Sequence, residues 1–112
     1  MGMSPTQLTL RQLRQDGYLC QVVEHWNPFA RRRVDLFGII DVLACRPNEL
    51  WGIQCTSAAN HSARREKARE TPELQSWLAA GGRFAIWSWK KVKNRWKLRS
   101  EELFAEDTSK MK

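Results

Sequence analysis

The spacing of apolar and polar residues divides the chain into short helical and β segments. At the N-terminus, Ser4 can accept the amide hydrogen of Gln7, and Pro5 suits the first position of a helix. This start predicts a short helix that runs to about Gln15 and ends before Gly17. Apolar, β-prone runs bounded by turn residues then predict three strands, over residues 18–24, 34–44 and 50–56.

The second half of the chain changes to helical spacing and then returns to strands. Helical segments are expected over residues 62–69 and from Pro72 to Gly81. A strand (83–89), a turn (93–94) and a returning strand (95–98) are expected next, followed by a short helix and a frayed tail over residues 100–112. The order α-β-β-β-α-β, with an added C-terminal hairpin strand, predicts an α/β fold in which one mixed β-sheet is flanked by helices.

The composition is that of one small globular domain. The 112 residues suffice for one core but not for two domains, so residues 1–112 are expected to form a single domain. The hydrophobic fraction of 42% excludes a disordered chain, and no apolar run is long enough for a membrane helix. The first residues lack the pattern of a signal peptide, so the three cysteines are expected to be reduced thiols in a cytoplasmic protein with no membrane partner.

The distribution of positive charge favours a nucleic-acid partner. The formal net charge is +7, and residues 83–99 hold seven basic residues and no acidic one. Clustered cations attract polyanions, so DNA is the expected partner; the alternative is a solvated basic face that only aids solubility. The candidate DNA-binding residues are Arg31, Arg32, Arg33, Arg64, Arg65, Lys90, Lys91, Lys93 and Arg95.

Asp41 is the candidate centre of a site, because it lies within an apolar run that predicts a buried strand. A buried carboxylate requires a partner, which is either an arginine such as Arg33 or a bound cation. In the next predicted strand Gln54 and Thr56 share one face, and the tight turn between the two strands would bring them toward Asp41. Carboxylate, amide and carbonyl oxygens are the ligands that Mg²⁺ or Mn²⁺ prefers.

The segments GIIDVLA and LWGIQCTS, which contain these residues, resemble the core motif of the PD-(D/E)XK nuclease superfamily. That family has an Asp on one strand and (Asp/Glu/Gln)-x-Lys on the next. The Gln form is similar to Mrr-type restriction endonucleases, and the order of elements resembles archaeal-type Holliday junction resolvases and the VRR-NUC group. The resemblance implies that Asp41, Gln54 and the backbone carbonyl of Cys55 bind Mg²⁺ or Mn²⁺ and that the protein hydrolyses phosphodiester bonds in branched or structured DNA.

One position departs from that pattern, because Thr56 stands where the family has lysine. A hydroxyl can hydrogen-bond the attacking water but supplies no positive charge. Lys67 in the following helix is expected to substitute for the missing lysine, with Arg64 and His61 as alternatives.

Two further acids are secondary candidates for metal binding. Glu24 ends the first predicted strand and would replace the family's helical glutamate, which has no counterpart in residues 5–15. Asp35 lies six residues before Asp41, roughly 20 Å along a flat strand, and joins the site only if the chain bends at Gly38.

The tryptophans bear on the partners of the protein. Trp87 and Trp89 share one face of a predicted strand and predict a homodimer interface; the alternative is that they stack with Trp96 on unpaired bases. The sequence as a whole therefore predicts a Mg²⁺-dependent DNA endonuclease. Two alternatives stay open: a nuclease-fold protein that binds DNA without cutting it, and a basic assembly protein that binds a partner through its tryptophans.

Overall fold

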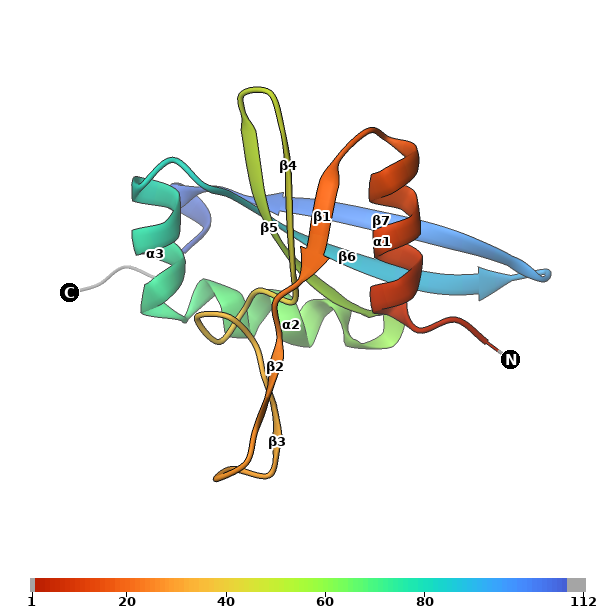
Figure 1. Ribbon diagram of the computed structural model, residues 1–112, viewed down its shortest axis with the longest axis horizontal. Coiled ribbons are helices and arrows are strands. Elements are labelled where there is room, and N and C mark those ends of the chain that lie inside the picture. The colour runs from red at the N-terminus through yellow and green to blue at the C-terminus, as the bar shows by residue number, and fades with distance from the viewer. Residues whose placement is uncertain (1, 109–112) are drawn as a thin grey trace.

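The computed structural model describes residues 2–108 and contains one five-stranded β-sheet with helices against both of its faces (Figure 1). Among these residues no helix is long and apolar enough to cross a membrane, and the three cysteines are free thiols, as expected. In chain order the elements are α1 (Pro5–Gln15), β1 (Leu19–Val22), β2 (His25–Asn27), β3 (Arg32–Val34), β4 (Val42–Arg46), β5 (Glu49–Ser57), η1 (Ala58–Asn60), α2 (His61–Arg69), α3 (Pro72–Ala79), β6 (Arg83–Val92), β7 (Arg95–Leu103) and η2 (Ala105–Asp107).

The sheet has the strand order β1-β4-β5-β6-β7. Strands β1, β4 and β5 form an antiparallel meander, β6 runs parallel to β5, and β7 returns antiparallel to β6. Parallel strands require a crossover, which α2 and α3 supply, whereas β4 and β5 are joined by a tight turn at residues 47–48. This mixed sheet flanked by helices confirms the α/β fold expected from the sequence.

The alternation of side chains along β5 assigns them to two cores, one on each face of the sheet. Ile53 packs with Leu13 in the core under α1. On the other face, Ile40 packs with residues of α2 and α3. Gly52 makes room for it, because a Cβ on Gly52 would lie 2.5 Å from the Cδ1 atom of Ile40. Gln54, two residues further along β5, projects from this second face.

The predicted strand over residues 34–44 is wrong, because the chain reverses inside it. Phe37 and Gly38 both have positive φ values, of 56° and 79°, and Leu36 pairs with Ile40 across the reversal. Glycine adopts positive φ without strain, which permits the turn at this point. The apolar run is therefore divided between β3, before the turn, and β4, after it.

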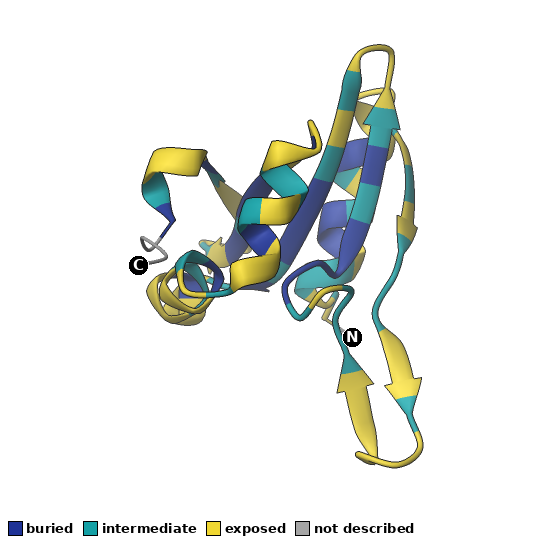
Figure 2. Ribbon diagram, turned by 90° about the vertical axis from the view of Figure 1, so that its left-hand side faces the viewer, coloured by how far each residue is buried: buried dark blue, intermediate teal, exposed yellow. Residues whose placement is uncertain are grey.

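Strands β2 and β3 form a separate hairpin that projects from the sheet (Figure 1). Most of its residues are exposed, as Figure 2 shows. The chain enters this hairpin directly from β1 and leaves it toward β4, so its base adjoins the edge of the main sheet.

The C-terminal part of the chain extends the sheet further than expected. Strand β7 runs to Leu103, so residues 100–103 are not the short helix predicted there. Strand β7 pairs with β6 without interruption, from Val92 opposite Arg95 to Phe84 opposite Leu103. This pairing keeps the backbone of residues 100–103 extended. Only residues 105–107 form a 3-10 turn, and the expected frayed tail over residues 109–112 lies outside the described residues.

The tryptophans expected at a dimer interface are covered by α1 of the same chain. Trp89 is 7% exposed, and its indole N–H donates to Thr9 Oγ1 at 2.9 Å. Trp87 packs against the core under α1. Trp89 is therefore not available to the interface expected through Trp87 and Trp89, because packing against α1 covers it, whereas Trp87 is only half-buried.

Candidate functional site

Asp41 and Gln54 lie side by side where β4 begins beside β5. Val42, the first residue of β4, pairs with Ile53, so the residue before it stands next to Gln54. Gln54 Nε2 donates to Asp41 Oδ2 at 2.8 Å, and the backbone N–H of Cys55 donates to the same oxygen at 2.8 Å. Asp41 is 5% exposed and Gln54 2%. The structure thus brings together the acid and the amide that the sequence singled out.

Two further carboxylates reach the same place. Gln54 Nε2 also donates to Asp35 Oδ2 at 3.2 Å, and one carboxylate oxygen from each of Glu24, Asp35 and Asp41 lies within 4.8 Å of the others. Asp35 arrives there through the reversal between β3 and β4, the bend on which its participation depended. Glu24 arrives because the N–H of Val23 donates to the Asp41 carbonyl at 2.8 Å, which holds the end of β1 against the start of β4. These three acids are called the acid cluster below.

Burial raises the pKa of Asp41 from its usual 3.8 to about 8. Desolvation is the largest cause, and a hydrogen bond with Asp35 raises the pKa further, because that bond requires a proton between the two carboxylates. The donors on Cys55 and Gln54 lower the pKa but do not outweigh these effects. At neutral pH without a cation, Asp41 therefore keeps a proton, and a divalent cation binding there would displace it.

Two oxygens beside the acid cluster are suited to a cation. Gln54 Oε1 is a buried acceptor without a hydrogen-bond partner among residues 2–108. The N–H and C=O of one strand residue point to the same side, so the Cys55 carbonyl faces the Asp41 end of β4, as its N–H does. Of these two oxygens the Cys55 carbonyl accompanies the carboxylates, whereas the Gln54 amide faces them with its nitrogen.

A polar cleft of about 650 Å³ opens over the acid cluster. Glu24 and Asp35 line it, while Asp41 is buried behind them. Four basic side chains line the same cleft: Arg32, Arg33, Arg64 and Lys67. A phosphate group in this cleft would meet positive charge from both the β2–β3 hairpin and α2, directly beside the acids. Arg33, the arginine considered as a partner for Asp41, forms an ion pair with Glu24 at 4.0 Å.

Thr56, which stands in the family's lysine position, lies apart from these contacts. It is buried on the same face as Gln54 and does not line the cleft. Lys67, by contrast, is exposed and lines the cleft. The structure thus provides an amino group near the acid cluster from α2 and not from β5.

The remaining candidate DNA-binding residues fall in other places. Arg65 pairs with Glu101 at 2.9 Å and with Glu66 at 3.1 Å, so its guanidinium is committed within the fold. Arg31 is exposed in the loop of the β2–β3 hairpin. The other four, Lys90, Lys91, Lys93 and Arg95, surround the distant turn of the long β6–β7 hairpin (Figure 1). The positive charge is therefore divided between the cleft and this turn.

His61 does not take part in the site. It is fully buried at the start of α2, where Nδ1 lies 2.6 Å from Ser88 Oγ and Nε2 lies 2.8 Å from Glu101 Oε1. Both ring nitrogens are engaged inside the fold, so the expectation that His61 accepts a proton from the attacking water is wrong. The histidine instead joins α2 to β6 and β7.

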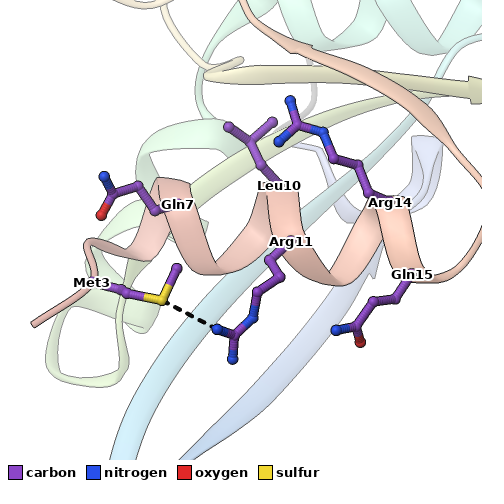
Figure 3. A pocket seen from close by; sticks show the side chains of 6 residues that line it. All are labelled: Met3, Gln7, Leu10, Arg11, Arg14 and Gln15. Carbon is purple, nitrogen blue, oxygen red and sulfur yellow. Dashed lines mark hydrogen bonds between the residues drawn. The ribbon is translucent and has the colours of Figure 1, made fainter.

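A second hollow, of about 620 Å³, lies along the outer side of α1 (Figure 3). Arg11 donates to the sulfur of Met3 across it at 3.5 Å. The side chains that line it are Met3, Gln7, Leu10, Arg11, Arg14 and Gln15. None of these described residues is acidic, so this hollow offers no carboxylate to a cation.

The sequence did not reveal the β2–β3 hairpin. No strand was expected over residues 25–33, which hold β2, the tip at residues 28–31 and most of β3. Glu24 and Asp35 were expected only as secondary candidates, because the hairpin that brings them to Asp41 from its two ends was missed.

No protein-family model matches the chain, and no curated protein or solved structure matches it either.

Proposed function

We propose that this protein is a divalent-metal-dependent endonuclease that hydrolyses phosphodiester bonds in DNA. The observation that carries the proposal is the convergence of three carboxylates, within 4.8 Å of one another, at a cleft lined by basic side chains. Carboxylates alone would repel a DNA backbone, so this arrangement suits DNA only with a cation between the acids and the phosphate.

The residues at the site fit Mg²⁺ or Mn²⁺. All the donors are hard oxygens, with Glu24, Asp35 and Asp41 as the charged ligands and the Cys55 carbonyl as a neutral one. Gln54 supports the fit, because turning its amide by 180° would present the unpartnered Oε1 to the carboxylates. That orientation is favourable only when a cation stands between these oxygens.

Each part of the site has a defined task in the proposed reaction. A bound Mg²⁺ supplies a Lewis acid for a phosphoryl oxygen and lowers the pKa of a bound water. The acid cluster would hold the cation, and the Cys55 N–H would orient Asp41 through its hydrogen bond. Lys67 and the arginines of the cleft bind the phosphate and stabilise the charge that develops on it, the task that Thr56 cannot perform.

A second candidate function is DNA binding without hydrolysis. The observation that favours it is Thr56, which supplies no positive charge and is buried away from the cleft. Under this alternative the basic cleft binds DNA, and the amino group of Lys67 is not placed to act on the reacting phosphate.

Incubation of the protein with four-way-junction, duplex and single-stranded DNA in Mg²⁺, Mn²⁺ or EDTA tests the proposal. Asp41→Asn is the informative variant, because asparagine keeps an oxygen acceptor for Gln54 and Cys55 but removes the charge. We expect metal-dependent cutting that falls at least about 100-fold in Asp41→Asn. Asp16→Asn is the matched control, because Asp16 is exposed at the end of α1 and contacts Gln12 rather than the cluster.

The alternatives give different results in the same experiment. Salt-sensitive DNA binding without cutting in any metal would favour the non-catalytic protein. Absence of DNA binding at low salt would exclude both and leave the assembly protein. Light scattering of the pure protein reports whether two copies associate, which cutting both strands of a duplex at one place would require.

A further inference from the structure

The β2–β3 hairpin carries the most exposed aromatic side chains of the described residues. Phe29 is 96% exposed and Trp26 is 58% exposed. Single exposed apolar residues are common on protein surfaces, so exposure alone does not indicate a binding site. Here the two rings stand on one projecting hairpin, away from both cores (Figures 1 and 2).

The loop at the tip holds Phe29 in a defined position. Asn27 Oδ1 accepts from the backbone N–H groups of Phe29 and Ala30, at 2.9 Å and 3.0 Å. The N–H of Arg31 donates to the Asn27 carbonyl at 2.7 Å, and Pro28 fixes its own φ angle. The phenyl ring is therefore presented outward by an ordered turn, and presenting it in advance lowers the entropic cost of binding.

The charge around these rings indicates the kind of partner. Arg31, Arg32 and Arg33 follow the tip directly, and Trp26 pairs with Arg33 across the hairpin. Aromatic rings among guanidinium groups match a partner that has both negative charge and flat apolar surfaces, and nucleic acid has both in its phosphates and bases. An anionic membrane would also attract the arginines, but it would repel the acid cluster at the base of the hairpin.

The length of the β2–β3 hairpin sets the distance between its tip and the acid cluster. One leg begins after Glu24 and the other ends before Asp35, so both ends of the hairpin belong to the acid cluster. Each leg has three residues, which gives a length of roughly 10 Å, and the turn adds a few ångströms. At about 3.4 Å per nucleotide, the tip lies about three or four nucleotides from a phosphate at the cluster.

We propose that this hairpin is a wedge that inserts Phe29 beside an unpaired or unstacked base and so directs the protein to branch points in DNA. The inference rests on the proposed function, because it takes the DNA phosphate to lie at the acid cluster. It adds the substrate class, which is DNA whose stacking is interrupted, and the position of cutting, which is about three or four nucleotides from the interruption.

Binding to intact DNA, measured in Ca²⁺ in place of Mg²⁺, tests the wedge with a cation between the acids and the phosphate. We compare a four-way junction with a continuous duplex of the same length, using the unaltered protein, Phe29→Ala and Phe29→Tyr. Phe29→Ala is expected to weaken junction binding by about 5-fold to 100-fold and to change duplex binding by less than about twofold. Phe29→Tyr, which keeps a ring, is expected to restore junction binding. Phe104→Ala is the matched control, because Phe104 is an exposed ring, at 49%, that follows β7 outside the hairpin.

A base analogue reports the insertion directly. With 2-aminopurine beside the branch point, the unaltered protein and Phe104→Ala are expected to raise its fluorescence by unstacking it, and Phe29→Ala is expected not to. Because Phe29 is 96% exposed, the two Phe29 variants should unfold at the temperature of the unaltered protein.

The possible results separate this inference from the proposed function. The wedge would be overturned if Phe29→Ala weakened junction and duplex binding equally, or weakened neither. It would also be overturned if, in a parallel assay with phosphatidylserine vesicles, Phe29→Ala lost only vesicle binding. Selective loss of junction binding without cutting in Mg²⁺ would support the wedge and count against hydrolysis. Cutting in Mg²⁺ by a protein whose junction preference does not depend on Phe29 would support hydrolysis and overturn the wedge.

Discussion

Without divalent cations, the stability of this protein is expected to fall as the pH rises from about 5 to about 7, because of Asp41. Its pKa is about 8 in the folded protein and near the usual 3.8 in the unfolded chain. Between these values the folded state keeps a proton that the unfolded state has released. The stabilisation from this proton is complete below the unfolded pKa and is lost as the pH approaches the folded pKa.

The size of this effect follows from the number of protons involved. One proton retained only in the folded state changes the free energy of unfolding by about 1.4 kcal/mol for each pH unit. Over two pH units in this window the loss is about 2.7 kcal/mol, which lowers the unfolding temperature of a 112-residue domain by about 10 °C.

Thermal unfolding in EDTA over a series of pH values measures this slope. Other titrating groups also contribute, so the informative quantity is the difference between the unaltered protein and Asp41→Asn. Asparagine carries no proton to lose, and its amide can donate to Asp35, so the variant should overtake the unaltered protein in stability as the pH rises. Saturating Mn²⁺ should stabilise the unaltered protein more at about pH 7.5 than at about pH 5, because protons compete with the metal.

Parallel stability curves for the two proteins in EDTA would refute this reasoning. They would show that Asp41 titrates in the folded protein as it does in the unfolded chain, and hence that its burial does not create a demand for a cation. Equal stabilisation of both proteins by Mn²⁺ would show that any bound metal lies elsewhere.

Three further predictions concern single features of the structure. Replacing Arg32 and Arg33 with alanine should weaken binding to all DNA sequences alike and reduce the slope of log affinity against log salt by about 2, as measured by fluorescence anisotropy at several salt concentrations. Gly52→Ala should lower the free energy of unfolding by about 1–3 kcal/mol in urea titrations, because its Cβ would collide with Ile40 in a filled core. His61→Ala should destabilise the protein by about 2–4 kcal/mol, because its hydrogen bonds to Ser88 and Glu101 are lost. Below its lowered unfolding temperature this variant should still cut DNA, and loss of cutting in folded protein would contradict the structural role.

Much of the fold could be predicted because its signals are local. The capping box at Ser4 fixes the start of α1 and is present as expected, with Ser4 and Gln7 each accepting from the backbone of the other. The error over residues 34–44 arose because an apolar run does not record a reversal within it. Phe37 there adopts a positive φ, which is uncommon for a bulky residue and which the surrounding structure, not its own preference, imposes.

The candidate site could be predicted only in part, for a related reason. Asp41 and Gln54 stand on neighbouring strands, so the alternation of side chains was enough to pair them. Glu24 and Asp35 are brought to Asp41 by the hairpin between them, which depends on tertiary packing. His61 was misjudged because its partners, on β6 and β7, are 27 and 40 residues away in the chain.

Asp35 and Asp41 of the acid cluster differ from the ion-paired acids of residues 2–108 in what neutralises them. Glu101 and Glu102 are held by arginines, and hydrogen bonds from Tyr18, Trp51 and Arg46 lower the pKa of Glu49 to about 2.

Asp35 and Asp41, by contrast, form no ion pair within residues 2–108, although the chain has 19 basic residues for 12 acidic ones and four of the basic ones line the adjoining cleft. Packing Asp41 away from water without a positive partner destabilises the fold, and an arginine in place of Gln54 would remove that cost. The fold instead gives Asp41 two uncharged N–H donors and places the carboxylates of Glu24 and Asp35 beside it, an arrangement that is unfavourable for folding and that the proposed cation would stabilise. A buried carboxylate without a positive partner costs stability, and this cost is the physical reason to assign the acid cluster a functional role.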